Sequence, residues 1–110
     1  MNTPKDDQYF LNKILTDLEF IAAHMNGVSK SALALDEVLL DSMLFRLIQT
    51  QENARKLTEE FKLSKINIPW TDIAGLRNRI VHDYGNVDLS IVYDTLTEDV
   101  PWLIDQLKEK

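Results

Sequence analysis

Apolar residues recur at spacings of three and four along most of the chain, and this period is typical of amphipathic helices. The first apolar stripe lies within residues 10–25 and predicts a helix that begins at Thr3 and Pro4, an N-cap and a first helical residue. Gly27 is expected to end this helix in a left-handed cap. The stretch 28–35 should connect it to the next helix, with a partial turn of its own.

A second and longer stripe predicts a helix from Asp36 to Phe61 or Lys62. At about 1.5 Å per residue this helix would be roughly 40 Å long and would form the main helix of the domain. A polar run at residues 49–53 interrupts the stripe. We expect this run either to face solvent or to line a polar site.

The third helix is expected to open at Pro69 and to end near Gly85. Asp88 is placed to cap a fourth helix, whose apolar stripe runs to Leu107. Pro101 falls inside that stripe, where its missing N–H should kink the helix or divide it. The pattern therefore predicts an all-α, antiparallel bundle of four helices, or of five if Pro101 divides the last one.

Length and composition narrow the class of protein. A chain of 110 residues, 45% of them hydrophobic and 27% charged, is expected to fold as a single domain over residues 1–110. The absence of cysteine excludes disulfides and thiolate metal sites. The N-terminus has no signal-peptide pattern, and no window approaches the about 18 apolar residues of a membrane span. We therefore expect a cytoplasmic protein without a membrane partner.

The distribution of charge qualifies the net charge of −6, which by itself argues against a nucleic-acid partner. Residues 46–79 hold seven Lys/Arg against four acids, a net +3, and the remainder carries −9. A polyanion site is thus expected to involve the middle of the chain, although a solvated helix of mixed charge explains most of these lysines equally well. Binding to bulk RNA should be weak and nearly independent of salt.

The strongest candidate chemistry lies in residues 77–84, where an Arg is followed after four residues by a His and after one more by a Tyr. On an ideal helix Arg77 is aligned with the apolar positions, where a guanidinium is costly unless a polar or anionic group meets it. A purely structural alternative pairs Arg77 with an acid such as Glu52. Arg77 and His82 would be about 140° apart on a straight helix, so either the helix unwinds before His82 or the two meet across subunits. Asn78 can share a face with His82.

This segment resembles the HepT branch of the HEPN superfamily. The resemblance rests on Arg-x4-His-x-Tyr at residues 77–84, on the Ile-Pro-Trp and Gly-Leu-Arg-Asn segments before it, and on Glu-Asp-Val-Pro-Trp at residues 98–102. It covers nearly the whole chain. One departure is Gln51-Glu52-Asn53, where members of the family usually have Gly-Glu.

The resemblance implies a toxin that cuts RNA, and not DNA, without metal or cofactor, in a cleft between two subunits. Arg77 and His82 would be its catalytic residues, with Asn78 in support. It also implies a cognate nucleotidyltransferase antitoxin that adenylylates Tyr84 and so silences the toxin; alternatively the Tyr84 hydroxyl only holds the end of the helix. A different class of function stays open, a non-catalytic helical module that binds a nucleotide or docks the nucleotidyltransferase.

The number of histidines favours a dimer on chemical grounds. Metal-free RNA cleavage needs a base for the 2′-hydroxyl, an acid for the leaving 5′-oxygen and a cation at the phosphate. The second histidine of the chain, His24, lies outside the motif, and with Asp17 it lacks a third ligand for a metal. A two-fold dimer would supply two copies of His82 and two of Arg77 to one phosphate. Trp70 and Trp102 are expected to anchor the core rather than to stack on bases.

Overall fold

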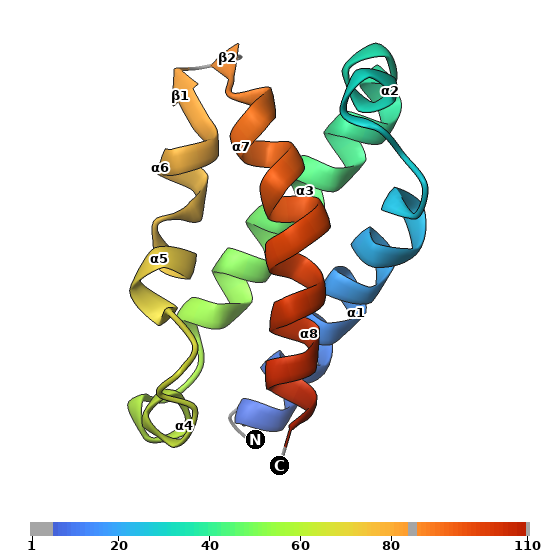
Figure 1. Cartoon of the computed structure of the whole chain (residues 1–110). Coiled ribbons are helices and arrows are strands. Elements are labelled where there is room, and N and C mark those ends of the chain that lie inside the picture. The colour runs from blue at the N-terminus through green and yellow to red at the C-terminus, as the bar shows by residue number, and fades with distance from the viewer. Residues whose placement is uncertain (1–5, 84–85, 110) are drawn as a thin grey trace, which may run out of the picture.

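The computed structural model describes residues 6–83 and 86–109, which form the predicted all-α bundle (Figure 1). Two long helices cross behind a C-terminal helical rod, and a shorter two-helix arm completes the bundle (Figure 1). In chain order the helices are α1 (Asp7–Met25), α2 (Lys30–Leu35), α3 (Glu37–Arg55), α4 (Glu59–Ser64), α5 (Trp70–Ala74), α6 (Leu76–Ile80), α7 (Leu89–Asp94), the π-helix η1 (Thr95–Asp99) and α8 (Val100–Lys108).

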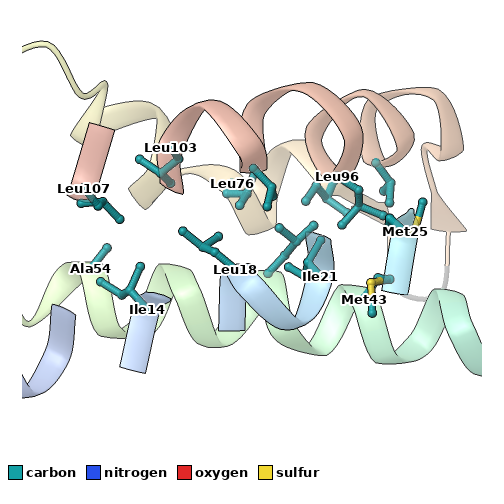
Figure 2. Packing of buried hydrophobic residues seen from close by; sticks show 14 of the residues in the cluster. Ile14, Leu18, Ile21, Met25, Met43, Ala54, Leu76, Leu96, Leu103 and Leu107 are labelled. Carbon is teal, nitrogen blue, oxygen red and sulfur yellow. The ribbon is translucent and has the colours of Figure 1, made fainter. Parts of the chain in front are cut away.

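The core forms where the apolar stripe of α1 meets α3 and the C-terminal rod. Ile14, Leu18 and Ile21 of α1 are at most 1% exposed. Figure 2 shows them in the apolar layer between the ribbon of α3 and that of the C-terminal helices. Burial of each such side chain stabilises the fold by roughly 1.5–3 kcal/mol. The first stripe therefore has the role that its spacing predicts.

The boundaries of α1 agree with the prediction at one end only. Gly27 has φ +76°, the left-handed conformation expected of it after the helix. At the other end Asp6 is the N-cap, because its carboxylate accepts a hydrogen bond from the Tyr9 N–H at 3.0 Å. The helix begins at Asp7, and the predicted start at Thr3 and Pro4 lies outside the described residues.

The second helix is shorter than predicted, since α3 ends at Arg55 and a separate helix, α4, begins after Thr58. Thr58 caps α4 by accepting from the Phe61 N–H at 3.1 Å. The Thr58 hydroxyl and N–H both donate to the Asp7 carboxylate, at 2.6 and 2.8 Å, and these two hydrogen bonds lower the pKa of Asp7. Asp7, which is 51 residues away in the sequence, thus accepts the Thr58 N–H at the point where the long helix was expected to continue.

The third helix also ends early, at Ile80 rather than near Gly85, which lies outside the described residues. Val81–Asp83 (β1) instead pairs antiparallel with Asn86–Val87 (β2). The Asp88 N–H also donates to the Ile80 carbonyl at 3.2 Å. These backbone bonds replace those of a continuing helix, so the segment that carries the motif histidine is extended.

The C-terminal rod is continuous from α7 to α8. Asp88 caps it as predicted, accepting from the Ile91 N–H at 3.2 Å. Pro101 does not divide the rod, because Asp99 and Val100 keep helical dihedral angles. The chain instead forms one π-helical segment, η1, just before the proline, which cannot donate a backbone hydrogen bond. Within the described part of the chain, none of the helices has the length and hydropathy needed to cross a bilayer.

Candidate active site

Arg77 lies on the solvent side of α6, where this helix packs on one flank of α3. The residue is exposed, and it lines a shallow depression with Leu44, Ile48 and Ile80. Its methylene groups can therefore cover apolar surface while the guanidinium stays in water. The predicted core-facing position is wrong, because Arg77 is exposed. The break at Gly75 between α5 and α6 separates it from the stripe of Ile73, whereas Ile80 still borders the same depression.

The structural alternative, an ion pair between Arg77 and Glu52, is absent. Both residues are exposed and no salt bridge joins them. Among side chains that the structure describes, the ion pairs are Asp17–Arg46, Glu59–Lys62 and Glu19–Lys108. No carboxylate of the described set therefore neutralises Arg77, and its guanidinium is accessible to an anion.

The neighbours of Arg77 on α6 differ in direction. Asn78 and Arg79 are both exposed. Because successive helical residues are about 100° apart, Arg79 points roughly opposite to Arg77, and it lines a cavity against α5 and the C-terminal rod. Arg77 is thus the cationic side chain that α6 presents beside α3, and Asn78 lies between the directions of the two arginines.

His82 follows in β1, two residues after α6 ends. Of the two alternatives for Arg77 and His82, the structure shows the first, because the helix ends before His82, and the 140° separation of a straight helix does not apply. The side chain of His82 and the whole of Tyr84 lie outside the described part of the structure. Their roles stay predictions.

Gln51 supports the site in a way that the sequence did not reveal. It is 5% exposed, and its Nε2 donates to the carbonyl of Ala74, the last residue of α5, at 3.1 Å. Its Oε1 is buried and has no hydrogen-bond partner among the described residues. Gln51 thereby fixes the C-terminal end of α5, directly before the break after which α6 begins and carries Arg77. The signal in the sequence was the polar run at 49–53, most of which is buried.

A cavity of about 310 Å³ is bordered by the α5–α6 arm, by α3 and by the C-terminal rod. Its walls are mostly apolar, with Asp72, Arg79 and Asp99 among the polar residues. Trp102 lines it while 43% exposed, so the prediction of a core anchor is wrong for this residue. Trp70 is half-buried and donates to two backbone carbonyls of the segment before it, as an anchor would.

The Lys and Arg side chains of residues 46–79 differ in whether they are free to bind an anion. Arg46 is engaged by Asp17 at 2.7 Å, and Lys65 donates to backbone carbonyls at the end of α8. Exposed members of the segment are Arg55, Lys56, Arg77 and Arg79. Among the described residues, no three of His, Cys, Asp or Glu gather as metal ligands would.

Comparison with known proteins gives matches over nearly the whole chain. The family described as "Ribonuclease HepT-like" matches residues 14–109. A protein of Caldanaerobacter subterraneus subsp. tengcongensis named "Putative RNase" is 31% identical over 109 residues, which are 99% of this chain and 95% of that protein. A Methanocaldococcus jannaschii protein, also named "Putative RNase", is 26% identical over 105 residues, 96% of this chain and 87% of its own length. "Probable ribonuclease HepT" of Thermococcus cleftensis is 33% identical over 52 residues, 47% of either chain. No solved structure matches this chain.

Proposed function

The chain belongs to the ribonuclease HepT-like family of the HEPN superfamily, and from this premise we propose that it is a metal-independent endoribonuclease toxin. Arg77 and His82 are its catalytic residues, and Asn78 supports them. The observation that carries the proposal is the exposed Arg77, which no described carboxylate neutralises. An accessible guanidinium on this side of α6 is suited to bind a phosphate.

In the proposed reaction the 2′-oxygen of the RNA attacks the neighbouring phosphorus and the bond to the 5′-oxygen breaks. One imidazole accepts the 2′-hydroxyl proton, and a second, protonated imidazole donates a proton to the leaving oxygen. Arg77 donates hydrogen bonds to the phosphate oxygens as negative charge grows on them. The products are a 2′,3′-cyclic phosphate and a 5′-hydroxyl end.

This chemistry requires two copies of the chain. Each chain contributes one motif histidine, His82, whereas the reaction uses one base and one acid. A two-fold dimer brings both imidazoles and both Arg77 guanidinium groups to one phosphate. Two cations at one place also make an anion site on a protein whose net charge is −6.

Regulation is proposed to act on Tyr84, two residues after His82. A cognate nucleotidyltransferase antitoxin would transfer an adenylyl group to the tyrosine hydroxyl. The new phosphodiester would offer Arg77 an anion in place of the RNA phosphate. Substrate would then be excluded by bulk and by charge.

The test is cleavage of cellular RNA in EDTA by wild type, Arg77→Ala and His82→Ala, with intact mass showing that Tyr84 is unmodified. We expect wild type to cut and either substitution to lower the rate by at least about 100-fold. Arg79→Ala is the matched control, since it removes an exposed arginine from the other side of the same helix. Cleavage that survives His82→Ala, or that requires a metal, would sink the proposal. If neither wild type nor any variant cuts RNA, the alternative function, a non-catalytic module that docks the nucleotidyltransferase, is favoured.

A further inference from the structure

A polar groove between α1 and α3 lies away from the proposed cleavage site. It has a volume of about 460 Å³, and its walls include Lys13 and Asp17 of α1 and Phe45, Arg46 and Gln49 of α3. Lys13 and Arg46 outnumber the one carboxylate, so the groove is slightly basic in a protein of net charge −6. Its surface therefore differs in character from the acidic remainder of the molecule.

Arg46 is fixed in the wall of this groove by two contacts. Its Nη1 lies 2.7 Å from the Asp17 carboxylate, and its guanidinium carbon lies 3.8 Å from the centre of the Phe20 ring. The imidazole of His24 stacks on the same ring at 3.9 Å, so the two flat groups occupy opposite faces of Phe20. Arg46 is therefore a fixed and neutralised part of the wall, and Lys13 is the cation of the groove that no described carboxylate neutralises.

Phe45 and Gln49 project from successive turns of α3. Phe45 is 57% exposed, unusual for a large aromatic side chain in a small domain. The carboxamide of Gln49 makes no hydrogen bond with the described residues, although the residue is half-buried. An open ring on which a base can stack and a free amide that can bind a base edge are the groups with which proteins recognise single-stranded RNA.

We propose that this groove binds a base and its phosphate from the single-stranded part of an RNA substrate. The inference rests on the proposed function, because it supplies a second contact for the strand that Arg77 would hold. Arg77 packs beside Leu44 and Ile48 on one flank of α3, and the groove lies along the flank that faces α1. The two places are thus separated by the width of α3, about 10–12 Å. One strand can pass over this helix and reach both.

Binding is tested with a 2′-O-methyl RNA strand of about twelve nucleotides, which lacks the hydroxyl needed for cleavage. Fluorescence anisotropy compares wild type with Phe45→Ala and Lys13→Gln. We expect Phe45→Ala to weaken binding about fivefold or more, because a stacking platform is lost. Lys13→Gln should make the slope of log affinity against log salt less negative by about 0.7, the value for one phosphate on a single strand.

Two matched controls remove similar side chains elsewhere. Leu63→Ala takes away an exposed apolar side chain of α4, and Lys108→Gln takes away an exposed lysine of α8. Both should bind the strand as wild type does. The proposal is overturned if wild type does not bind, if Phe45→Ala and Lys13→Gln bind as wild type does, or if Phe45→Ala changes the oligomeric state, which would assign Phe45 to a contact between copies.

Cleavage separates this inference from the proposed function. On unmodified RNA, Phe45→Ala should raise KM for a long strand and leave cleavage of a dinucleotide unchanged, because the dinucleotide cannot span α3. An equal loss on both substrates would contradict the groove. A wild-type protein that binds the 2′-O-methyl strand through Phe45 and cuts no RNA would refute the nuclease and leave the groove in place.

Discussion

Two glycines next to helix ends differ in what they require of the backbone. Gly27 has φ +76°, where a side chain is strained even though nothing lies within 4 Å of the added carbon. Gly75 has an ordinary φ of −92°, and a Cβ there would lie 3.7 Å from the Thr71 carbonyl oxygen, a normal contact. Only the first position therefore depends on glycine for its conformation.

Alanine at these two positions should have opposite effects. Gly27→Ala is expected to lower the free energy of unfolding by about 1 kcal/mol or slightly more, through left-handed strain. Gly75→Ala should leave it unchanged or raise it by up to about 1 kcal/mol, because alanine restricts the unfolded chain. Urea denaturation of both variants beside wild type measures the difference. Equal losses would show that Gly75 also needs its missing side chain.

The surroundings of Arg77 were predicted from the sequence only in part. The Arg-x4-His-x-Tyr spacing located the candidate residues in the sequence and left two arrangements open, and the structure shows that the helix ends before His82. The exposure of Arg77 was not predicted, because the spacing alone aligned this residue with the apolar positions of a straight helix. Nor could the support from Gln51, whose hydrogen bond to the Ala74 carbonyl joins segments 23 residues apart.

At the level of helices and strands, periodicity predicted the bundle and local chemistry predicted some of its ends. The left-handed Gly27 and the cap at Asp88 need only neighbouring residues, and both were found as expected. The end of α3 was missed because the apolar stripe continues to Phe61, while the bonds that divide the helix come from Asp7, 51 residues from Thr58. Hydrophobic spacing carries no information about such a partner.

The contact between α1 and α4 should make stability depend on pH. Hydrogen bonds from Thr58 lower the pKa of Asp7 below 3.8, so the contribution of Asp7 to stability is full above 3.8 and is lost as the pH falls through the lower folded-state value. Asp7→Asn should therefore be less stable than wild type at neutral pH, with the difference narrowing below 3.8.

Thermal unfolding followed by circular dichroism at several pH values measures this difference. Asp41→Asn is a suitable control, because Asp41 is exposed on α3 and makes no hydrogen bond or ion pair with other described residues. A difference between wild type and Asp7→Asn that stays constant through the acid range would contradict the proposed linkage.

For the whole molecule, a shared cleft predicts that one defective chain disables the dimer. Wild-type and His82→Ala chains are co-expressed with separate affinity tags and purified as the mixed dimer, which keeps both arginines and one histidine at the cleft. Because the proposed reaction uses one imidazole as the base and the other as the acid, the mixed dimer should cut RNA at far less than half the rate of the wild-type dimer. A mixed dimer of wild-type and Arg79→Ala chains is the control and should keep the full rate. Half of the wild-type rate would show that each chain carries a complete site and would argue against a composite cleft.

The cavity of about 310 Å³ beside the α5–α6 arm should affect how often this arm opens. Side chains that border this solvent-accessible cavity have fewer protein neighbours on that side, and the arm consists of two five-residue helices. Its amide hydrogens should therefore exchange with solvent deuterium well before those of α1 and α3, which enclose the core. Arg77 would then be carried by a segment that opens more often than the core helices, so that opening of the arm, and not unfolding of the core, limits how long the arginine stays in place.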